Sequence, residues 1–201
     1  MKNAIYLLLV MIITVSLFSC KKSNSSAFGT SVSGTENVLS LAIYDPEEFS
    51  FHGIRARGYE FKSDKDGRIT HFGARLSKGT YPVVLWDSSA QSVIKAVNVT
   101  VSDSTKFNYV DIDDISIVAN KVYVITVLNT DVDNAGVETE PLFFNITAPA
   151  DYLPKTVGDI TYIASVEKSN PPNSSTLFPY SFAPEKDIIM GCPSFKFEPR
   201  Q

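Results

Sequence analysis

Few residues in this chain have the side chains and spacing that catalysis requires. Nucleophilic catalysis needs a nucleophile, a base and an orienting group, and histidine is the usual base. The sequence contains two histidines, His52 and His71, and neither lies in a recognisable motif. We therefore predict no catalytic residues. A glycosidase-type carboxylate pair is assembled in space rather than in sequence, so a hydrolase is kept as the third and least favoured hypothesis.

Acidic loops provide a candidate metal site. Asp131, Asp133 and Asn134 lie close together, and Ca²⁺ prefers carboxylate and carbonyl oxygens of this kind. Their spacing resembles the start of an EF-hand loop, but Ala135 and Leu142 stand where that motif has ligands. The EF-hand reading therefore fails. Two alternatives stay open: a structural Ca²⁺ ion, or acids that are solvated in a turn. No other cofactor is expected.

Aromatic residues provide a candidate ligand site. Sugar binding commonly uses an aromatic platform with a few fixed polar groups beside it. Trp86, the only tryptophan, is one candidate platform, and Phe178 and Tyr180 in the proline-rich stretch Ser169–Asp187 are two more. A tryptophan in a strand is also a typical core residue, and these aromatics could equally pack against the fold. Both readings stay open at this point.

The beginning of the chain has the three parts of a secretory signal. Lys2 supplies a positive start, residues 4–18 are uncharged and apolar, and Ser19-Cys20 follows. The segment Leu17-Phe18-Ser19-Cys20 resembles the lipobox of bacterial lipoproteins, in which the cysteine is acylated and the chain is cut before it. Because each CH₂ group buried in the membrane contributes about 0.8 kcal/mol to the free energy of binding, two or three acyl chains make a lasting anchor. The alternative is an uncleaved membrane-spanning helix.

Composition limits the partners and the domain organisation. The net charge of −4 is spread along the chain, which argues against a nucleic-acid partner. We expect a signal peptide in residues 1–19, a lipidated Cys20 with a flexible tether through residue 35, and a single domain in residues 36–201. Acylation of Cys20 would leave Cys192 without a disulfide partner.

The domain is predicted to be all-β. Short apolar or alternating runs are separated by turn residues, and no window outside the signal shows sustained helical periodicity. Gly67 is the expected positive-φ position of the turn that follows Ser63. The fold class that this pattern predicts is an antiparallel β-sandwich, jelly-roll-like. The predicted strands are 38–44, 57–61, 68–75, 80–87, 92–101, 107–110, 122–128, 142–146, 160–166 and 194–197.

The middle of the chain is similar to a domain-of-unknown-function family of galactose-binding-like β-sandwiches in bacterial surface and glycan-associated proteins. Four segments carry the resemblance, in the family's order: Gly58-Tyr59-Glu60-Phe61, Asp66-Gly67-Arg68-Ile69, residues 81–87 and residues 121–125. The resemblance implies a jelly-roll-like sandwich and a non-catalytic attachment or binding role. It supplies no ligand residues.

These observations give an ordered set of functional hypotheses. The first is a lipid-anchored, extracytoplasmic module that binds carbohydrate or serves in attachment. The second is a structural or protein-interaction subunit of a cell-envelope complex, fimbria-like, that pairs through sheet edges. The expected location is the bacterial cell envelope, anchored in the outer membrane by lipid. Lys21 and Lys22 stand in place of the acidic run that marks surface export in some lipoproteins, so the leaflet stays open.

Overall fold

The computed structural model shows an antiparallel β-sandwich, as the sequence pattern predicts. It describes residues 32–33, 45–51, 55–129, 138–144, 153–169, 178–179, 188–189 and 193–201. Cys20, Cys192 and the residues assigned to the signal and most of the tether lie outside this range. The strands are β1 (Val32–Ser33), β2 (Asp45–Phe51), β3 (Arg55–Ser63), β4 (Gly67–Ala74), β5 (Gly79–Asp87), β6 (Ser92–Val101), β7 (Asn108–Ile117), β8 (Val122–Asn129), β9 (Glu138–Phe144), β10 (Lys155–Val157), β11 (Ile160–Ser169), β12 (Ile188–Ile189) and β13 (Pro193–Pro199).

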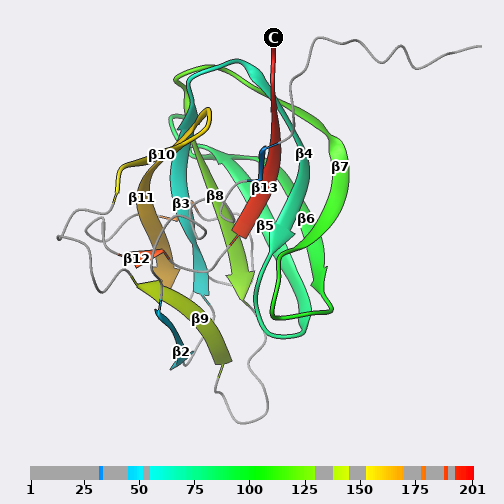
Figure 1. Ribbon diagram of the computed structural model, residues 1–201, viewed down its shortest axis with the longest axis vertical. Coiled ribbons are helices and arrows are strands. Elements are labelled where there is room, and N and C mark those ends of the chain that lie inside the picture. Colours follow the sequence, from blue (N-terminus) through cyan, green and yellow to red (C-terminus); the bar gives the residue numbers. More distant parts are fainter. Residues whose placement is uncertain are drawn as a thin grey trace, which may run out of the picture.

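Two antiparallel sheets form the layers of the sandwich. The larger sheet has the strand order β10-β11-β3-β8-β5-β6, and the smaller has the order β1-β13-β4-β7. A third, three-stranded sheet has the order β12-β9-β2. Strands β6 and β7 are the last strands of the two main sheets, and they lie at the same side of the sandwich, away from β10 (Figure 1).

Alternating side chains of both sheets fill the space between the two layers. On the larger sheet the inner positions include Tyr59 and Phe61, and they are buried against Phe195 of the smaller sheet. The rings of Phe61 and Phe195 have centroids 4.5 Å apart, which suits aromatic packing. The Tyr59 hydroxyl donates a hydrogen bond of 2.8 Å to the buried carbonyl of Pro193. Aromatic packing and this hydrogen bond therefore join the layers.

The larger sheet is also covered on its outer face. On β5, Val83 and Leu85 belong to the main core, whereas Val84 and Trp86 belong to a second cluster with Val124. A strand that is buried on both faces shows a continuous apolar run rather than alternation. This burial explains why residues 83–86 of β5 are all apolar.

Most predicted strands in the described residues are confirmed, and the differences have clear physical causes. Strand β6 has the predicted bounds, but the register shifts between Leu85 and Trp86 on its partner β5. As a result Val93 pairs with Trp86 on the outer face, whereas Val97 pairs with Val83 on the inner face. The even spacing of Val93, Val97, Val99 and Val101 predicts one shared face, but Val93 lies on the opposite face from Val97. An inserted residue in a strand cannot be recognised from an even spacing of valines.

Two turn predictions are wrong. Gly67 does not have a positive φ; it begins β4, and an added Cβ would lie 2.4 Å from the ring of Phe197. A glycine is therefore needed at this position to leave room for the Phe197 ring, and not to allow a turn conformation. Asp45 and Pro46, predicted to end a strand, instead begin β2, which pairs with β9. The predicted strand 38–44 lies outside the described residues.

The described part of the chain contains no helix with the length and apolarity needed to cross a membrane.

Gly58 provides a direct test of this packing. An added Cβ would lie 1.8 Å from the main-chain carbonyl oxygen of Ile125, and that backbone is held in the β3–β8 ladder. We expect Gly58→Ala to lower the free energy of unfolding by roughly 3 kcal/mol, measured by urea denaturation. The exposed Ser104→Ala should change it by less than about 0.5 kcal/mol. Equal urea midpoints for the two variants would contradict the β3–β8 arrangement.

Candidate functional site: the open edge at β6 and β7

Trp86, the sugar platform predicted from the sequence, lies in the second core. Only 2% of the residue is exposed, and its indole N–H donates a hydrogen bond of 3.1 Å to the hydroxyl of Thr126. The ring of Phe178 packs against it edge-to-face, with centroids 5.7 Å apart. A pyranose needs an open aromatic face, and Trp86 offers none in this structure.

Of the other two aromatic residues predicted to bind a sugar, the one that the structure describes also packs against the domain. Phe178 is half-buried against Trp86, and its neighbour Pro179 is buried. These two residues of the proline-rich stretch therefore pack on the domain. Tyr180 lies outside the described residues. Every aromatic side chain that the structure describes is buried or half-buried, so none in that part of the chain forms a projecting platform.

The three aspartates of β7 each lie beside a different basic residue. In β7, Asp113 lies 3.3 Å from the ammonium of Lys95, and Asp114 forms an ion pair with Arg68. Asp111 lies 4.0 Å from His71 Nε2. No three described His, Cys, Asp or Glu residues gather to hold a metal ion. The predicted calcium ligands Asp131, Asp133 and Asn134 lie outside the described residues, as does His52.

Strand β6 is an open edge with few of the usual protective features. Among the strands that the structure describes, β6 pairs with β5 and has no partner on its other side. An unpaired edge leaves a row of N–H and C=O groups that can pair with another strand. Natural proteins block such edges with short strands, charges, proline or bulges. Strand β6 is ten residues long, has no proline, and has one charged residue, Lys95.

The other described edges of the sandwich are blocked. Strands β10 and β1 have three and two residues, respectively. Strand β7 is long, but it carries Asp111, Asp113 and Asp114, and its register with β4 shifts between Ile69 and His71. Strand β6 has its own bulge near Ile94, but Lys95 to Val101 keep a regular register with β5. The segment from Lys95 to Val101 is therefore the accessible edge, and we call it the β6 edge.

An open groove separates the β6 edge from β7. It has a volume of ≈ 580 Å³ and is lined by Lys95, Val97, Asp111, Ile112, Asp113 and Asp114. Val97 and Ile112 are partly buried and pack against the main core. The other lining residues, three aspartates and Lys95, are charged, so the surface of the groove is mainly polar. The groove lies where the irregular part of β7 interrupts its pairing with β4.

The turn that precedes β6 is held by Asp87. Its carboxylate accepts hydrogen bonds from the N–H groups of Ser89 and Ala90, at 2.9 and 3.0 Å, and lies 2.6 Å from the ammonium of Lys121. Lys121, the Ala90 N–H and the Ser89 hydroxyl together keep the pKa of Asp87 well below its usual value. Asp87 therefore stays ionised and fixes the start of β6 at ordinary pH.

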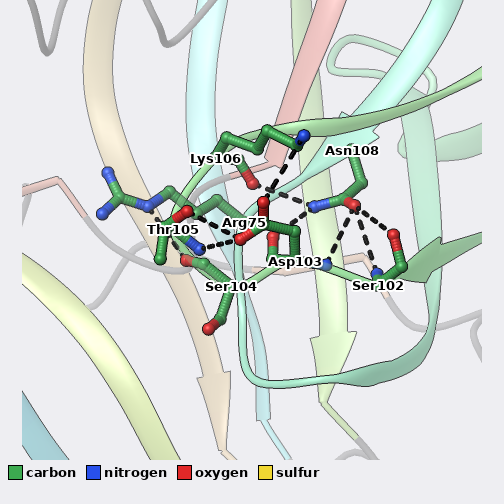
Figure 2. Close-up of polar contacts among 7 residues, drawn as sticks. All are labelled: Arg75, Ser102, Asp103, Ser104, Thr105, Lys106 and Asn108. Carbon is green, nitrogen blue, oxygen red and sulfur yellow. Dashed lines mark hydrogen bonds and ion pairs between the residues drawn. The ribbon is translucent and has the colours of Figure 1, made fainter.

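The loop that follows β6 is held by Asn108 and Asp103 (Figure 2). The Asn108 side-chain carbonyl accepts from the N–H and hydroxyl of Ser102, each at 3.1 Å, and its amide donates to the Asp103 carbonyl at 2.7 Å. The Asp103 carboxylate accepts from the N–H and hydroxyl of Thr105, at 3.0 and 2.6 Å. This loop passes from the larger to the smaller sheet, so it fixes the spacing between β6 and β7.

Sequence reasoning missed this site because its signal is weak. The valine-rich run of β6 was recognised as a strand, but nothing in it distinguishes an edge strand from a central one. The useful signal is the contrast between a nearly uncharged β6 and an acidic β7. That contrast has meaning only once the topology places these strands together.

Comparison of the chain with protein-family models, curated proteins and solved structures found no significant match.

The single tryptophan allows the burial of Trp86 to be measured directly. We expect its fluorescence in the folded chain to be blue-shifted relative to the unfolded chain and poorly quenched by iodide, because water and ions cannot reach the ring. Unfolding in urea provides the control, since it should expose the ring and restore quenching. Strong quenching in the folded chain would return Trp86 to the list of candidate platforms.

Proposed function

We propose that this protein is a non-catalytic, lipid-anchored attachment module of the bacterial cell envelope that binds a protein partner through the β6 edge. One observation carries the proposal. Strand β6 is a long, regular, nearly uncharged strand at an open sheet edge, whereas the other edges of the sandwich that the structure describes are short or acidic. A strand of a partner can add to such an edge through main-chain hydrogen bonds.

The sequence supports the anchored location. Leu17-Phe18-Ser19-Cys20 has the lipobox pattern, and a short polar tether follows it. Because β1 begins at Val32, the predicted tether through residue 35 is too long: a flexible tether after Cys20 would have at most the 11 residues 21–31. Such a tether would span roughly 18 Å on average, so the domain would stay close to the bilayer. The resemblance to galactose-binding-like sandwiches agrees with a binding role rather than a catalytic one.

The burial of the aromatic residues favours a protein partner over a glycan. Trp86 and Phe178 pack against each other, and the described aromatics leave no projecting platform. In contrast, Val93 and Ile94 of β6 are 40% and 39% exposed. Exposed apolar side chains next to unpaired peptide groups suit strand pairing better than sugar stacking.

Site-specific photo-crosslinking in the native cells tests the proposal. A crosslinking residue at Ala96, which is exposed on β6, should yield one defined adduct with an envelope protein. The same residue at Val118, which is 54% exposed outside the edge, provides the matched control and should yield none. Asn98→Lys, at an exposed position of the β6 edge, should reduce the Ala96 adduct several-fold, because an added charge blocks edge pairing, whereas Val118→Lys should leave it unchanged. An absent adduct at Ala96, or equal adducts at both positions, would contradict the proposal.

The two cysteines provide a matched pair for the anchor. We expect Cys20→Ala to abolish acylation and release the chain from the membrane fraction, because the acyl chains supply the binding free energy. Cys192→Ala should stay acylated and bound. Acyl mass and detergent partitioning report both properties. Retention of the Cys20→Ala chain in membranes would support an uncleaved helix instead.

A further inference from the structure

We propose that the strand accepted by the β6 edge is a basic extended segment of another protein, seated over the groove between β6 and β7. This inference rests on the proposed function and specifies the chemistry of the partner. It follows from two features: the geometry of a strand added beside β6, and the charge of the groove lining.

The first feature is geometric. A strand added beside β6 extends the larger sheet by one position, which places it over the side of the sandwich where β7 lies. Because side chains alternate between the faces of a strand, every second side chain of the added strand would point toward the smaller sheet. Those side chains would enter the groove beside Val97 and Ile112. The partner therefore needs, at these alternating positions, side chains that suit a lining of three aspartates and one lysine.

The second feature is the charge of the groove lining. Three aspartates of β7 line the groove, and Lys95 is the one basic residue in its lining. Arg68 lies against Asp114 from outside the groove. Asp111 and Asp113 have side chains that are 85% and 96% exposed, so their carboxylates are available to an incoming cation. Lysine or arginine residues in the partner strand would complement this acidic rim, and acidic residues would be repelled.

The same charge argues against a second copy of this chain. Two β6 strands paired in antiparallel fashion about a two-fold axis would extend the larger sheet and bring both β7 strands to the same seam. Asp111 and Asp113 of each copy would then approach those of the other, which is unfavourable. A basic partner removes this repulsion, so the groove fits a different protein.

Two end-blocked ten-residue peptides test the inference on the purified full chain. One alternates valine and lysine, and the other alternates valine and glutamate. We expect the lysine peptide to bind at least tenfold more tightly by fluorescence anisotropy, and its affinity to fall as salt is added. The double variant Asp111→Asn, Asp113→Asn should weaken binding of the lysine peptide several-fold. Asp64→Asn, an exposed acid in the β3–β4 turn, is the matched control and should bind like the native chain.

The possible results separate this inference from the function on which it rests. Equal binding of both peptides, or no effect of the double variant, would overturn the basic partner. Failure of both peptides to bind while Ala96 still forms its crosslink in cells would also overturn the inferred strand chemistry, but would leave the β6 edge as the attachment site. A chain that dimerises by sedimentation, and that Asn98→Lys returns to a monomer, would place a second copy at the β6 edge and overturn the inference.

Discussion

The unpaired peptide groups at the edges of an open sheet are the constraint that organises this molecule. A closed barrel has no such edges, but a sandwich of two open sheets has four. An edge that is not short, charged or covered is free to pair with a strand of another protein. Here β1 and β10 are short, and β7 carries three aspartates. Along Lys95 to Val101, β6 is long and regular and carries a single charge, that of Lys95, and this difference leads to the proposed function.

The rest of the fold keeps that edge rigid. Strand β5, to which β6 is paired, is buried on both faces by the main core and by the Trp86 cluster. Asp87 fixes the turn before β6, and Asn108 with Asp103 fixes the loop after it. An edge that is held at both ends loses little conformational entropy when a strand is added, which favours binding. The groove beside β7 then gives the added strand a preferred face and charge.

Much of the fold was predictable from the sequence, because alternation and turn residues act locally. The bounds of β6 were predicted to the residue, and the predicted bounds of the strands that contain Trp86 and Tyr123 differ from the observed ones by one residue at one end.

The C-terminal part of β7 was missed because Asp111, Asp113 and Asp114 look like a solvated loop, whereas the smaller sheet holds them as an irregular edge. The role of Gly67 was missed because the space that a Cβ would need at this position is occupied by the ring of Phe197, which belongs to a strand distant in the sequence. The candidate site could not be predicted for the same reason, since it exists only where β6 and β7 meet. The proposed lipobox at Cys20 rests on a local sequence pattern, so proposing it needs no knowledge of the fold.

Hydrogen–deuterium exchange of the β6 amides tests the central claim most directly. The full chain would be compared in isolated native envelopes and after purification in detergent, with exchange read in peptides that cover residues 92–101. The account predicts that β6 amides facing away from β5 exchange slowly in the envelope and rapidly after purification, because the partner strand is then lost. Amides of β7 at Asn108 to Val110 should behave alike in both samples. Identical, rapid exchange of β6 in both samples would contradict the claim that this edge is occupied where the protein works.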